Sequence, residues 1–175
     1  MDATDASLRA ALRRLGYDAF RPGQERIVQD LLAQRDVLAI MPTGAGKSLP
    51  YQLLSQVLPR ATVVISPLIA LMQDQRDALE EAGIPAAIVN STLSTAERDD
   101  TLGAVADGRT KLVYVTPETF TTNTFLDVLR QAGVALVAVD EAHCISQWGH
   151  DFRPAYLRLA AGIAALGRPP VLALT

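Results

Sequence analysis

The chain has 175 residues, 49% of them hydrophobic, which is enough apolar material to bury the core of one globular domain. Its net charge of −3 excludes a general binder of polyanions, so any contact with a nucleic acid has to be local and sensitive to salt. The single cysteine excludes an internal disulfide framework and is typical of a reducing compartment, and the N-terminal residues lack the apolar segment of a signal peptide or membrane anchor.

Apolar runs alternate with amphipathic segments along the whole chain, which predicts an α/β fold with a mostly parallel sheet and helices on both faces. Pro22, Pro67 and Pro117 each suit the first turn of a helix, whereas Gly16 and Gly83 suit helix ends. Strands are expected at 36–41, 62–66, 86–89, 111–116, 134–139 and 170–174. Helices are expected near 5–15, 22–34, 47–58, 67–82, 94–106, 117–131 and 155–166.

A glycine-rich segment, Met-Pro-Thr-Gly-Ala-Gly-Lys-Ser, lies between the first expected strand and the third expected helix. Gly44 and Gly46 allow the backbone N–H groups to turn inward around anionic oxygens, as in a P-loop. Lys47 is expected to reach the β- and γ-phosphates of ATP, and the Ser48 hydroxyl is expected to bind Mg²⁺. The general motif has glycine where this chain has Met41, and the alternative is an ordinary glycine-rich turn. The predicted nucleotide-binding residues here are Thr43, Gly44, Ala45, Gly46, Lys47 and Ser48.

Two acidic residues follow the continuously apolar run 134–139, which is typical of a strand buried on both faces. The carboxyl end of such a strand is where open α/β sheets hold their ligands. Asp140 is expected to hold Mg²⁺, and Glu141 is expected to orient and deprotonate the attacking water. The alternative is that Asp140 only caps a following helix.

Two further segments flank these motifs: Leu-Gly-Tyr-Asp-Ala-Phe-Arg-Pro-Gly-Gln at 15–24 and Gln-Trp-Gly-His-Asp-Phe-Arg-Pro at 147–154. With Asp-Glu-Ala-His-Cys-Ile-Ser at 140–146, they make the chain resemble the first RecA-like domain of RecQ-family DNA helicases over essentially its whole length. The resemblance implies a RecA-like P-loop NTPase fold, ATP and Mg²⁺ as cofactors, and single-stranded and partially duplex DNA as partners. It also implies an ATP-dependent helicase of the 3′–5′ type that acts in DNA repair and recombination.

The same resemblance implies that residues 1–175 are truncated at the C-terminal edge and work with a second RecA-like domain of the same polypeptide. Because that second domain supplies an arginine worth about 10³–10⁵ in rate, the chain alone is expected to hydrolyse ATP barely. Residues 1–34 are expected to form a helical adenine-motif segment. The expected location is the cytoplasm of a bacterial cell, with the nucleoid and without membrane contact.

The resemblance also implies which residues contact the adenine base and which residue couples the ATP site to the second domain. Gln24 is similar to the residue that reads adenine through its amide, and Tyr17 and Arg21 are similar to the pair that stacks on the base. The alternative for all three is a solvated helix end. His143 is expected to couple the ATP site to the second domain without taking part in the chemistry.

A DNA-contacting surface is implied by the tripeptides at 66–68 and 116–118 and by the aromatic segment at 146–153. Hydroxyls and helix N-termini suit phosphates, aromatic rings such as Trp148 and Phe152 stack on bases, and Arg153 suits a phosphate. Capped helix starts and a local hydrophobic staple are the alternatives. The implied DNA-binding or coupling residues are Ser66, Pro67, Leu68, Thr116, Glu118, Gln147, Trp148, His150, Phe152 and Arg153.

Other functions remain open at this stage. An RNA helicase or double-strand translocase of the same superfamily shares the P-loop and the acidic pair, and a non-catalytic module would use ATP only to gate a partner. A P-loop kinase would need an acceptor site and a lid, of which the sequence gives no sign. Zinc ligation by His143, Cys144, His150 and Asp151 is disfavoured because their spacing is unlike that of standard zinc sites.

Overall fold

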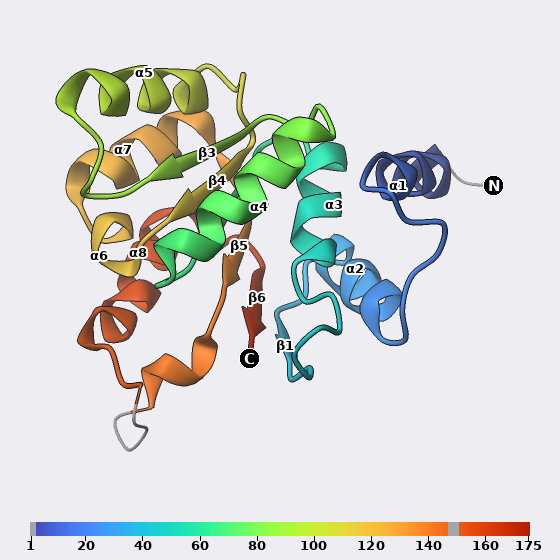
Figure 1. The fold of residues 1–175 in the computed structure, drawn as a ribbon. Helices are drawn as coiled ribbons and strands as arrows, with labels where there is room; N and C mark the ends of the chain where they lie inside the picture. Colours follow the sequence, from blue (N-terminus) through green and yellow to red (C-terminus); the bar gives the residue numbers. More distant parts are fainter. Residues whose placement is uncertain (1–2, 147–150) are drawn as a thin grey trace.

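The computed structural model describes residues 3–146 and 151–175, and within these ranges six parallel strands form one sheet (Figure 1). The strand order is β1-β6-β5-β2-β4-β3, and every neighbouring pair is parallel. All six expected strands are therefore confirmed. Their bounds are β1 Val37–Ala39, β2 Ala61–Ile65, β3 Ala86–Val89, β4 Leu112–Val115, β5 Val134–Val139 and β6 Val171–Leu174.

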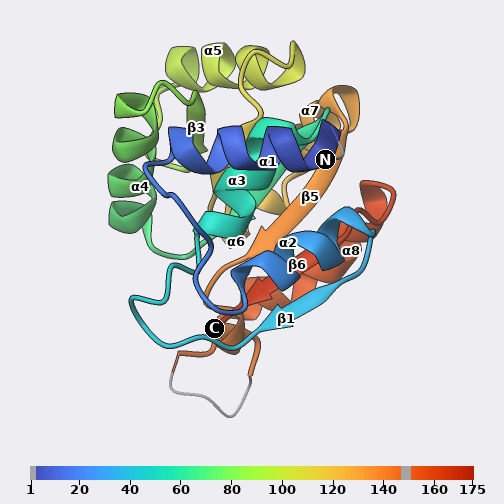
Figure 2. The same ribbon diagram turned by 90° about the vertical axis from the view of Figure 1, so that its right-hand side faces the viewer.

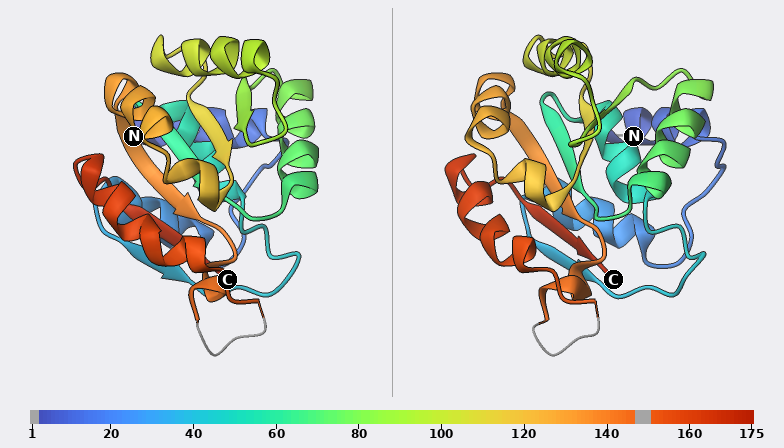
Figure 3. Two further views of the ribbon diagram at one scale, coloured as in Figure 1. Left: turned by 90° about the vertical axis from the view of Figure 1, so that its left-hand side faces the viewer. Right: turned by 60° about the vertical axis from the view of Figure 1, so that its left-hand side comes forward.

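Helices cover both faces of the sheet, in two layers that Figure 3 separates clearly. One layer consists of α1 (Ala3–Arg14), α2 (Gln24–Leu32), α3 (Leu49–Val57) and α4 (Ile69–Glu81). The other consists of α5 (Thr95–Ala106), α6 (Pro117–Phe120), α7 (Asn123–Ala132) and α8 (Leu159–Ala165), with the short 3₁₀ turns η1 (Ala142–Ile145) and η2 (Pro154–Arg158) beside them.

Successive side chains along a strand point alternately toward the two helical layers. In β4, Leu112 and Tyr114 pack against the first helical layer, whereas Val113 and Val115 pack against the second. All four side chains are almost fully buried. A strand that is apolar at every position therefore stabilises both cores, which explains why the central runs show no polar alternation.

Several predicted helix boundaries are wrong. Pro22 and Pro67 lie outside the helices, because α2 begins at Gln24 after Gly23 (φ 87°) and α4 begins only at Ile69. The helix expected over 117–131 is two helices, since Thr122 is extended and donates its hydroxyl to the carbonyl of residue 119. The hydroxyls of threonine compete in this way with helical hydrogen bonds. The helix expected over 155–166 begins with the 3₁₀ turn η2.

Helix ends at Gly16 (φ 82°) and Gly83 (φ 69°) are as predicted. The helices are otherwise short, and none in the described ranges combines the length and apolar character needed to cross a bilayer.

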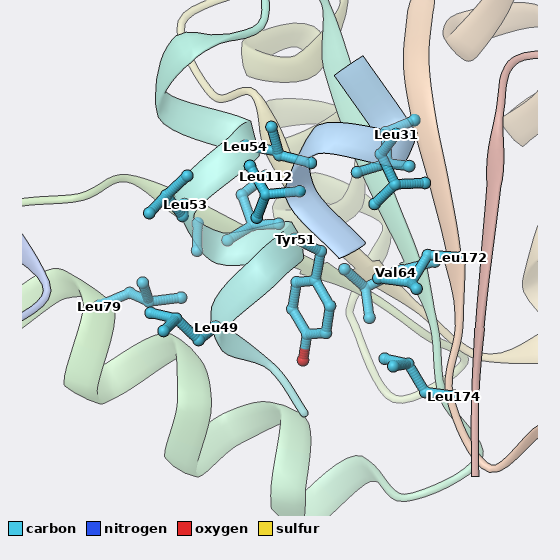
Figure 4. Packing of buried hydrophobic residues seen from close by; sticks show 14 of the residues in the cluster. Leu31, Leu49, Tyr51, Leu53, Leu54, Val64, Leu79, Leu112, Leu172 and Leu174 are labelled. Carbon is cyan, nitrogen blue, oxygen red and sulfur yellow. The ribbon is translucent and has the colours of Figure 1, made fainter. Parts of the chain in front are cut away.

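The largest apolar cluster lies between the sheet and α3, where Tyr51, Leu53 and Leu54 are almost completely buried (Figure 4). This cluster anchors α3 beneath the loop that precedes it. Figure 2 shows that this loop, the C-terminus after β6 and the segment after β5 all lie at the same edge of the sheet. The carboxyl ends of the parallel strands meet there, so this edge is where a ligand site is expected.

Candidate functional site

The P-loop connects β1 to α3 and is fixed at its start by β6. The backbone N–H of Met41 donates to the carbonyl of Thr175 at 3.0 Å. Gly44 (φ 79°) and Gly46 (φ 78°) both adopt the left-handed conformation that other residues rarely adopt. The helix α3 then begins at Leu49, directly after Lys47 and Ser48. The strand, glycine turn and helix expected from the sequence are therefore all present in that order.

Gln24 supports this loop from the start of α2. Its side chain is only 1% exposed, and its Oε1 accepts from the backbone N–H of Arg21 at 2.8 Å. Its Nε2 donates to the carbonyls of Ala45 at 3.2 Å and Gly46 at 2.9 Å. Both amide protons are thus used by the loop. A bidentate contact with adenine stays a prediction, and it would require one of these two bonds to be exchanged.

Tyr17 and Arg21 face different cavities. Tyr17 is 40% exposed and lines a cavity of about 290 Å³ together with Ser48 and Asp74. Arg21 lines a separate cavity of about 650 Å³ near β1, and its Nη1 donates to the carbonyl of Gly44 at 2.6 Å. The two side chains thus line different cavities, and their stacking on adenine stays a prediction.

Asp140 lies at the carboxyl end of β5, and its backbone is held on both sides. Its N–H donates to the carbonyl of Ile65 at 2.9 Å, and its own carbonyl accepts from the buried Tyr156 hydroxyl at 2.8 Å. Burial raises the pKa of Asp140 above its ordinary value. A hydrogen bond from the N–H of Glu141 and the positive charge of Lys47 partly offset that rise in pKa.

The effect of Lys47 on the pKa of Asp140 has a structural meaning. A charge acts on a carboxyl in this way only when the two groups are near each other. Contacts of Thr175 agree with this: it binds Met41 at the start of the glycine loop and His143 after the acidic pair, so the two motifs meet at the end of β6. A side-chain hydrogen bond with Ser66, at the end of β2, also lowers the pKa of Asp140 and adds a third element to this neighbourhood.

Glu141 and His143 form a second group beside the acid. Glu141 has φ 51°, an unfavourable conformation for a residue with a side chain, and such strain clusters at functional sites. The Nδ1 atom of His143 lies 3.3 Å from Glu141 Oε2 and 2.9 Å from Thr175 Oγ1. Its Nε2 atom lies 3.9 Å from Asp151 Oδ2. His143 thus links the acidic pair to the end of β6, and its coupling to a second domain stays a prediction.

A cleft of about 480 Å³ brings Glu141 and His143 together with several residues expected to contact DNA. Pro67, Leu68, Phe152 and Arg153 also line this cleft. Arg153 is held by its backbone N–H, which donates to the carbonyl of Cys144 at 2.9 Å. Gln147, Trp148 and His150, from the same predicted surface, lie outside the described residues. A ligand in the cleft would contact both the residues predicted to bind DNA and Glu141, the predicted general base.

The hydroxyls of Ser66 and Thr116, which are also predicted to contact DNA, already form hydrogen bonds within the chain. Ser66 is buried, and its hydroxyl accepts from the N–H of Leu68 at 3.4 Å. Thr116 caps α6, where its hydroxyl accepts from the N–H of Thr119 at 3.4 Å, while Glu118 is exposed. Both hydroxyls therefore already stabilise their own loops, but only Thr116 caps a helix as the alternative expects, since the N-cap of α4 is Leu68. Contact of either hydroxyl with DNA stays a prediction.

A zinc site finds no support among residues 3–146 and 151–175, where no group of three histidine, cysteine or acidic residues is arranged to hold a metal. Cys144 is buried, and burial raises the pKa of its thiol. His150, one of the four candidate ligands, lies outside the described residues.

Sequence reasoning missed two residues of the site. Thr175 binds both His143 and the start of the P-loop, and Tyr156 holds the carbonyl of Asp140. The signal for Thr175 was available, because it is the polar residue directly after the last apolar run, as Asp140 is after the previous one. Nothing in the sequence indicated the role of Tyr156, since an aromatic residue in a helical segment more often only packs in the hydrophobic core.

Comparisons with known proteins agree with this geometry. The sequence profile of the family described as "DEAD/DEAH box helicase" matches residues 21–175. The chain is 49% identical over 162 residues to the ATP-dependent DNA helicase RecQ of Bacillus subtilis, covering 91% of this chain and 27% of that protein. It is 44% identical over 160 residues to RecQ of Haemophilus influenzae, covering 91% and 26% of the two chains. The chain thus spans about a quarter of the length of these relatives.

Solved structures of helicases have the same fold. The Mycobacterium smegmatis helicase Lhr bound to ssDNA and AMP-PNP matches with a TM-score of 0.73 at 21% identity, over 97% of this chain and 24% of that one. The helicase MrfA bound to DNA and AMPPNP matches with a TM-score of 0.73 at 19% identity, over all of this chain and 26% of that one. The predicted α/β architecture of a RecA-like helicase domain is therefore confirmed.

Proposed function

Because this chain belongs to the DEAD/DEAH box helicase family and is an ATP-binding domain of the RecQ type, we propose that residues 1–175 are the first RecA-like domain of an ATP-dependent DNA helicase. The observation that carries the proposal is that Thr175 contacts both motifs: its carbonyl accepts from Met41 at the start of the P-loop, and its hydroxyl lies 2.9 Å from His143, just after the acidic pair. The P-loop and the acid after β5 then act on one triphosphate. The P-loop residues from Thr43 to Ser48 enclose its phosphates, with Lys47 at the β- and γ-phosphates.

Mg²⁺ fits the side chains around Asp140. That carboxyl is buried and forms no ion pair with another residue in the described ranges. A buried carboxylate without a cation is unfavourable, and hard oxygen ligands are those that Mg²⁺ prefers. The Asp140 carboxylate and the Ser48 hydroxyl are therefore the proposed ligands. When bound, the ion neutralises charge on the phosphates.

Glu141 has a different proposed role from Asp140. Glu141 accepts a proton from the water that attacks the γ-phosphate, and its φ of 51° turns it from the strand direction toward the cleft. His143 holds Glu141 from one side through Nδ1 and relays its position to Thr175. Gln24 and Arg21 hold the carbonyls of the P-loop, and Tyr17 stacks on the base in the cavity beside Ser48.

Single-stranded DNA is the proposed occupant of the cleft beside Glu141. Phe152 stacks on a base and Arg153 contacts a phosphate, while Pro67 and Leu68 complete the lining of the cleft. Ser66, Thr116, Glu118, Gln147, Trp148 and His150 complete the proposed DNA-facing surface. Because the cleft reaches Glu141, DNA in it is able to alter the position of the catalytic base.

The whole protein is proposed to be a 3′–5′ helicase that unwinds partially duplex DNA in repair and recombination, in the cytoplasm of a bacterial cell. A second RecA-like domain of the same polypeptide contributes the arginine that stabilises the transition state, an effect of about 10³–10⁵ in rate. This chain by itself therefore binds nucleotide and turns it over very slowly.

Lysine substitution tests the nucleotide site directly, because the chain has only two lysines, at opposite ends of the sheet. We expect Lys47→Ala to weaken binding of a fluorescent ATP analogue with Mg²⁺ by about 10- to 100-fold, the loss of a charge-assisted hydrogen bond. Lys111→Ala is the matched control, since Lys111 donates only to the carbonyl of Leu58 at 3.3 Å, and it should change binding by less than about 2-fold. Equal effects of both substitutions would refute the assignment.

An RNA helicase or a double-strand translocase is the competing enzyme, and a nucleotide-gated module without turnover is the competing class. ATPase rates of the full-length polypeptide with single-stranded DNA, duplex DNA and RNA separate these functions. The proposal expects the largest stimulation with single-stranded DNA. Stimulation only by RNA would refute it, and so would the absence of turnover under every condition.

A further inference from the structure

A pair of buried polar contacts extends from α3, the helix that follows the P-loop. The Tyr51 hydroxyl donates to Gln75 Oε1 at 2.6 Å, and Gln52 Nε2 donates to the Tyr114 hydroxyl at 3.4 Å. Tyr51 and Tyr114 are each only 1% exposed, and their rings meet edge to face with centroids 6.3 Å apart. These four side chains join α3 to two other elements of the fold.

Both of those elements lead to the proposed DNA surface. Gln75 lies on α4, the helix that begins directly after Leu68. Tyr114 lies on β4, which ends just before Thr116. The helix that follows the P-loop is therefore joined, by one hydrogen bond each, to the helix after the segment 66–68 and to the strand before Thr116.

Stability alone does not account for the Tyr51 hydroxyl. Its ring belongs to the apolar cluster that also contains Leu54 and Val64, and Figure 4 shows the hydroxyl pointing away from Leu54 and Leu112. Phenylalanine would bury the same ring in that cluster without removing a polar group from water. A buried hydrogen bond contributes little net stability, but its direction and length fix the spacing of the two helices that it joins.

We propose that Tyr51 is a positioning residue that transmits movement of the P-loop helix to α4 through Gln75, and so couples nucleotide binding to DNA affinity. This inference rests on the proposed function. When nucleotide binding shifts α3, the hydrogen bond requires α4 to follow, and the segment from Ser66 to Leu68 moves with it. Phenylalanine at position 51 would allow α3 to slide past α4 without that requirement.

The test measures the coupling between the two ligands in the full-length polypeptide. The dissociation constant of a fluorescent oligo-dT strand is measured with and without a saturating non-hydrolysable ATP analogue and Mg²⁺. The ratio of the two constants is the coupling factor, and thermodynamic linkage requires the same factor when the ligands are exchanged. We expect Tyr51→Phe to reduce this factor by about 2- to 10-fold, the range of one hydrogen bond, while each affinity measured alone changes by less than about 2-fold.

Two further variants distinguish coupling from simple damage. Gln75→Met removes the acceptor, and the double variant with Tyr51→Phe should lose no more coupling than Tyr51→Phe alone, because both changes remove one bond. Gln73→Met is the matched control, since Gln73 is an exposed residue of the same helix, and it should leave the factor unchanged.

The outcomes separate this inference from the function on which it rests. A wild-type protein that binds no nucleotide would overturn the proposed function itself. A wild-type protein that binds both ligands with a coupling factor of 1 would overturn only the inference. An unchanged factor in Tyr51→Phe, or an equal loss in Gln73→Met, would overturn it as well.

Discussion

Gly46→Ala provides a sharp test of how the P-loop is held. A Cβ atom at Gly46 would lie 2.6 Å from Gln24 Nε2, a distance that real Cβ atoms essentially never show. The same substitution at Gly44 would meet nothing within 4 Å. Both residues have almost the same φ, 78° and 79°, so the backbone strain is common to the two substitutions. Gly44→Ala is therefore a matched control.

The magnitudes follow from these contacts. Left-handed backbone strain in a residue with a side chain is worth about 1–2 kcal/mol, which is the whole expected destabilisation for Gly44→Ala. Gly46→Ala has the same strain and also displaces the amide of Gln24 from the carbonyls of Ala45 and Gly46. Each lost hydrogen bond is worth about 1 kcal/mol, so the expected total is about 3–4 kcal/mol.

Urea unfolding of the wild-type chain and the variants measures these free energies, and Gln24→Ala completes a double-mutant cycle. In a Gln24→Ala background the new methyl group has no amide to displace, so Gly46→Ala should cost only about 1–2 kcal/mol, the strain. The coupling energy is then about 2 kcal/mol. Equal losses of unfolding free energy for Gly44→Ala and Gly46→Ala, or simple additivity in the cycle, would refute the conclusion that Gln24 holds the loop at Gly46.

Two other substitutions test the interior of the sheet. Because burial raises the pKa of Asp140, the folded chain retains a proton that the unfolded chain has released, so the free energy of unfolding falls as pH rises above the ordinary value of 3.8. Asp140→Asn should therefore be more stable than the wild type at pH 7 but not at pH 3 in urea titrations, and a less stable variant at pH 7 would contradict this. Thr62→Val should raise the free energy of unfolding by about 1–2 kcal/mol in the same urea titrations, because Thr62 Oγ1 is a buried atom without a hydrogen-bond partner among the described residues. A lower free energy of unfolding in this variant would contradict the prediction.

Local patterns in the sequence were sufficient for the strands and for the order of strand, glycine turn and helix around the P-loop. The run 134–139 was expected as a strand, and β5 has those bounds, because a strand buried on both faces is apolar at every position. The break of the expected helix 117–131 at Thr122 was not predictable in the same way. It depends on a hydroxyl that bonds a carbonyl of the preceding turn in preference to the helix, and helical spacing of apolar residues does not reveal this competition.

Side-chain direction at the site was the least predictable property. The sequence indicates that Gln24 has an amide with two donors and one acceptor, but the choice between a base and the protein depends on which carbonyls lie nearby. Those carbonyls come from Ala45 and Gly46, and they face Gln24 only because the loop has two left-handed glycines. Arg21 is a second case, because its Nη1 donates to the carbonyl of Gly44, and its stacking on adenine stays a prediction.

Strand order explains how residues far apart in the chain form one functional edge. β2 pairs with β5 on one side and with β4 on the other, so Ser66 at its end lies between Asp140 and Thr116. The contacts of Ser66 follow this position: its backbone N–H donates to the carbonyl of Val115 at 3.0 Å, and its side chain bonds Asp140. A change at the acid therefore reaches the proposed DNA surface through a single strand end. Together with the Tyr51–Gln75 bond, this gives the proposed ATP site two short connections to the proposed DNA surface, one along the sheet edge and one through the helices.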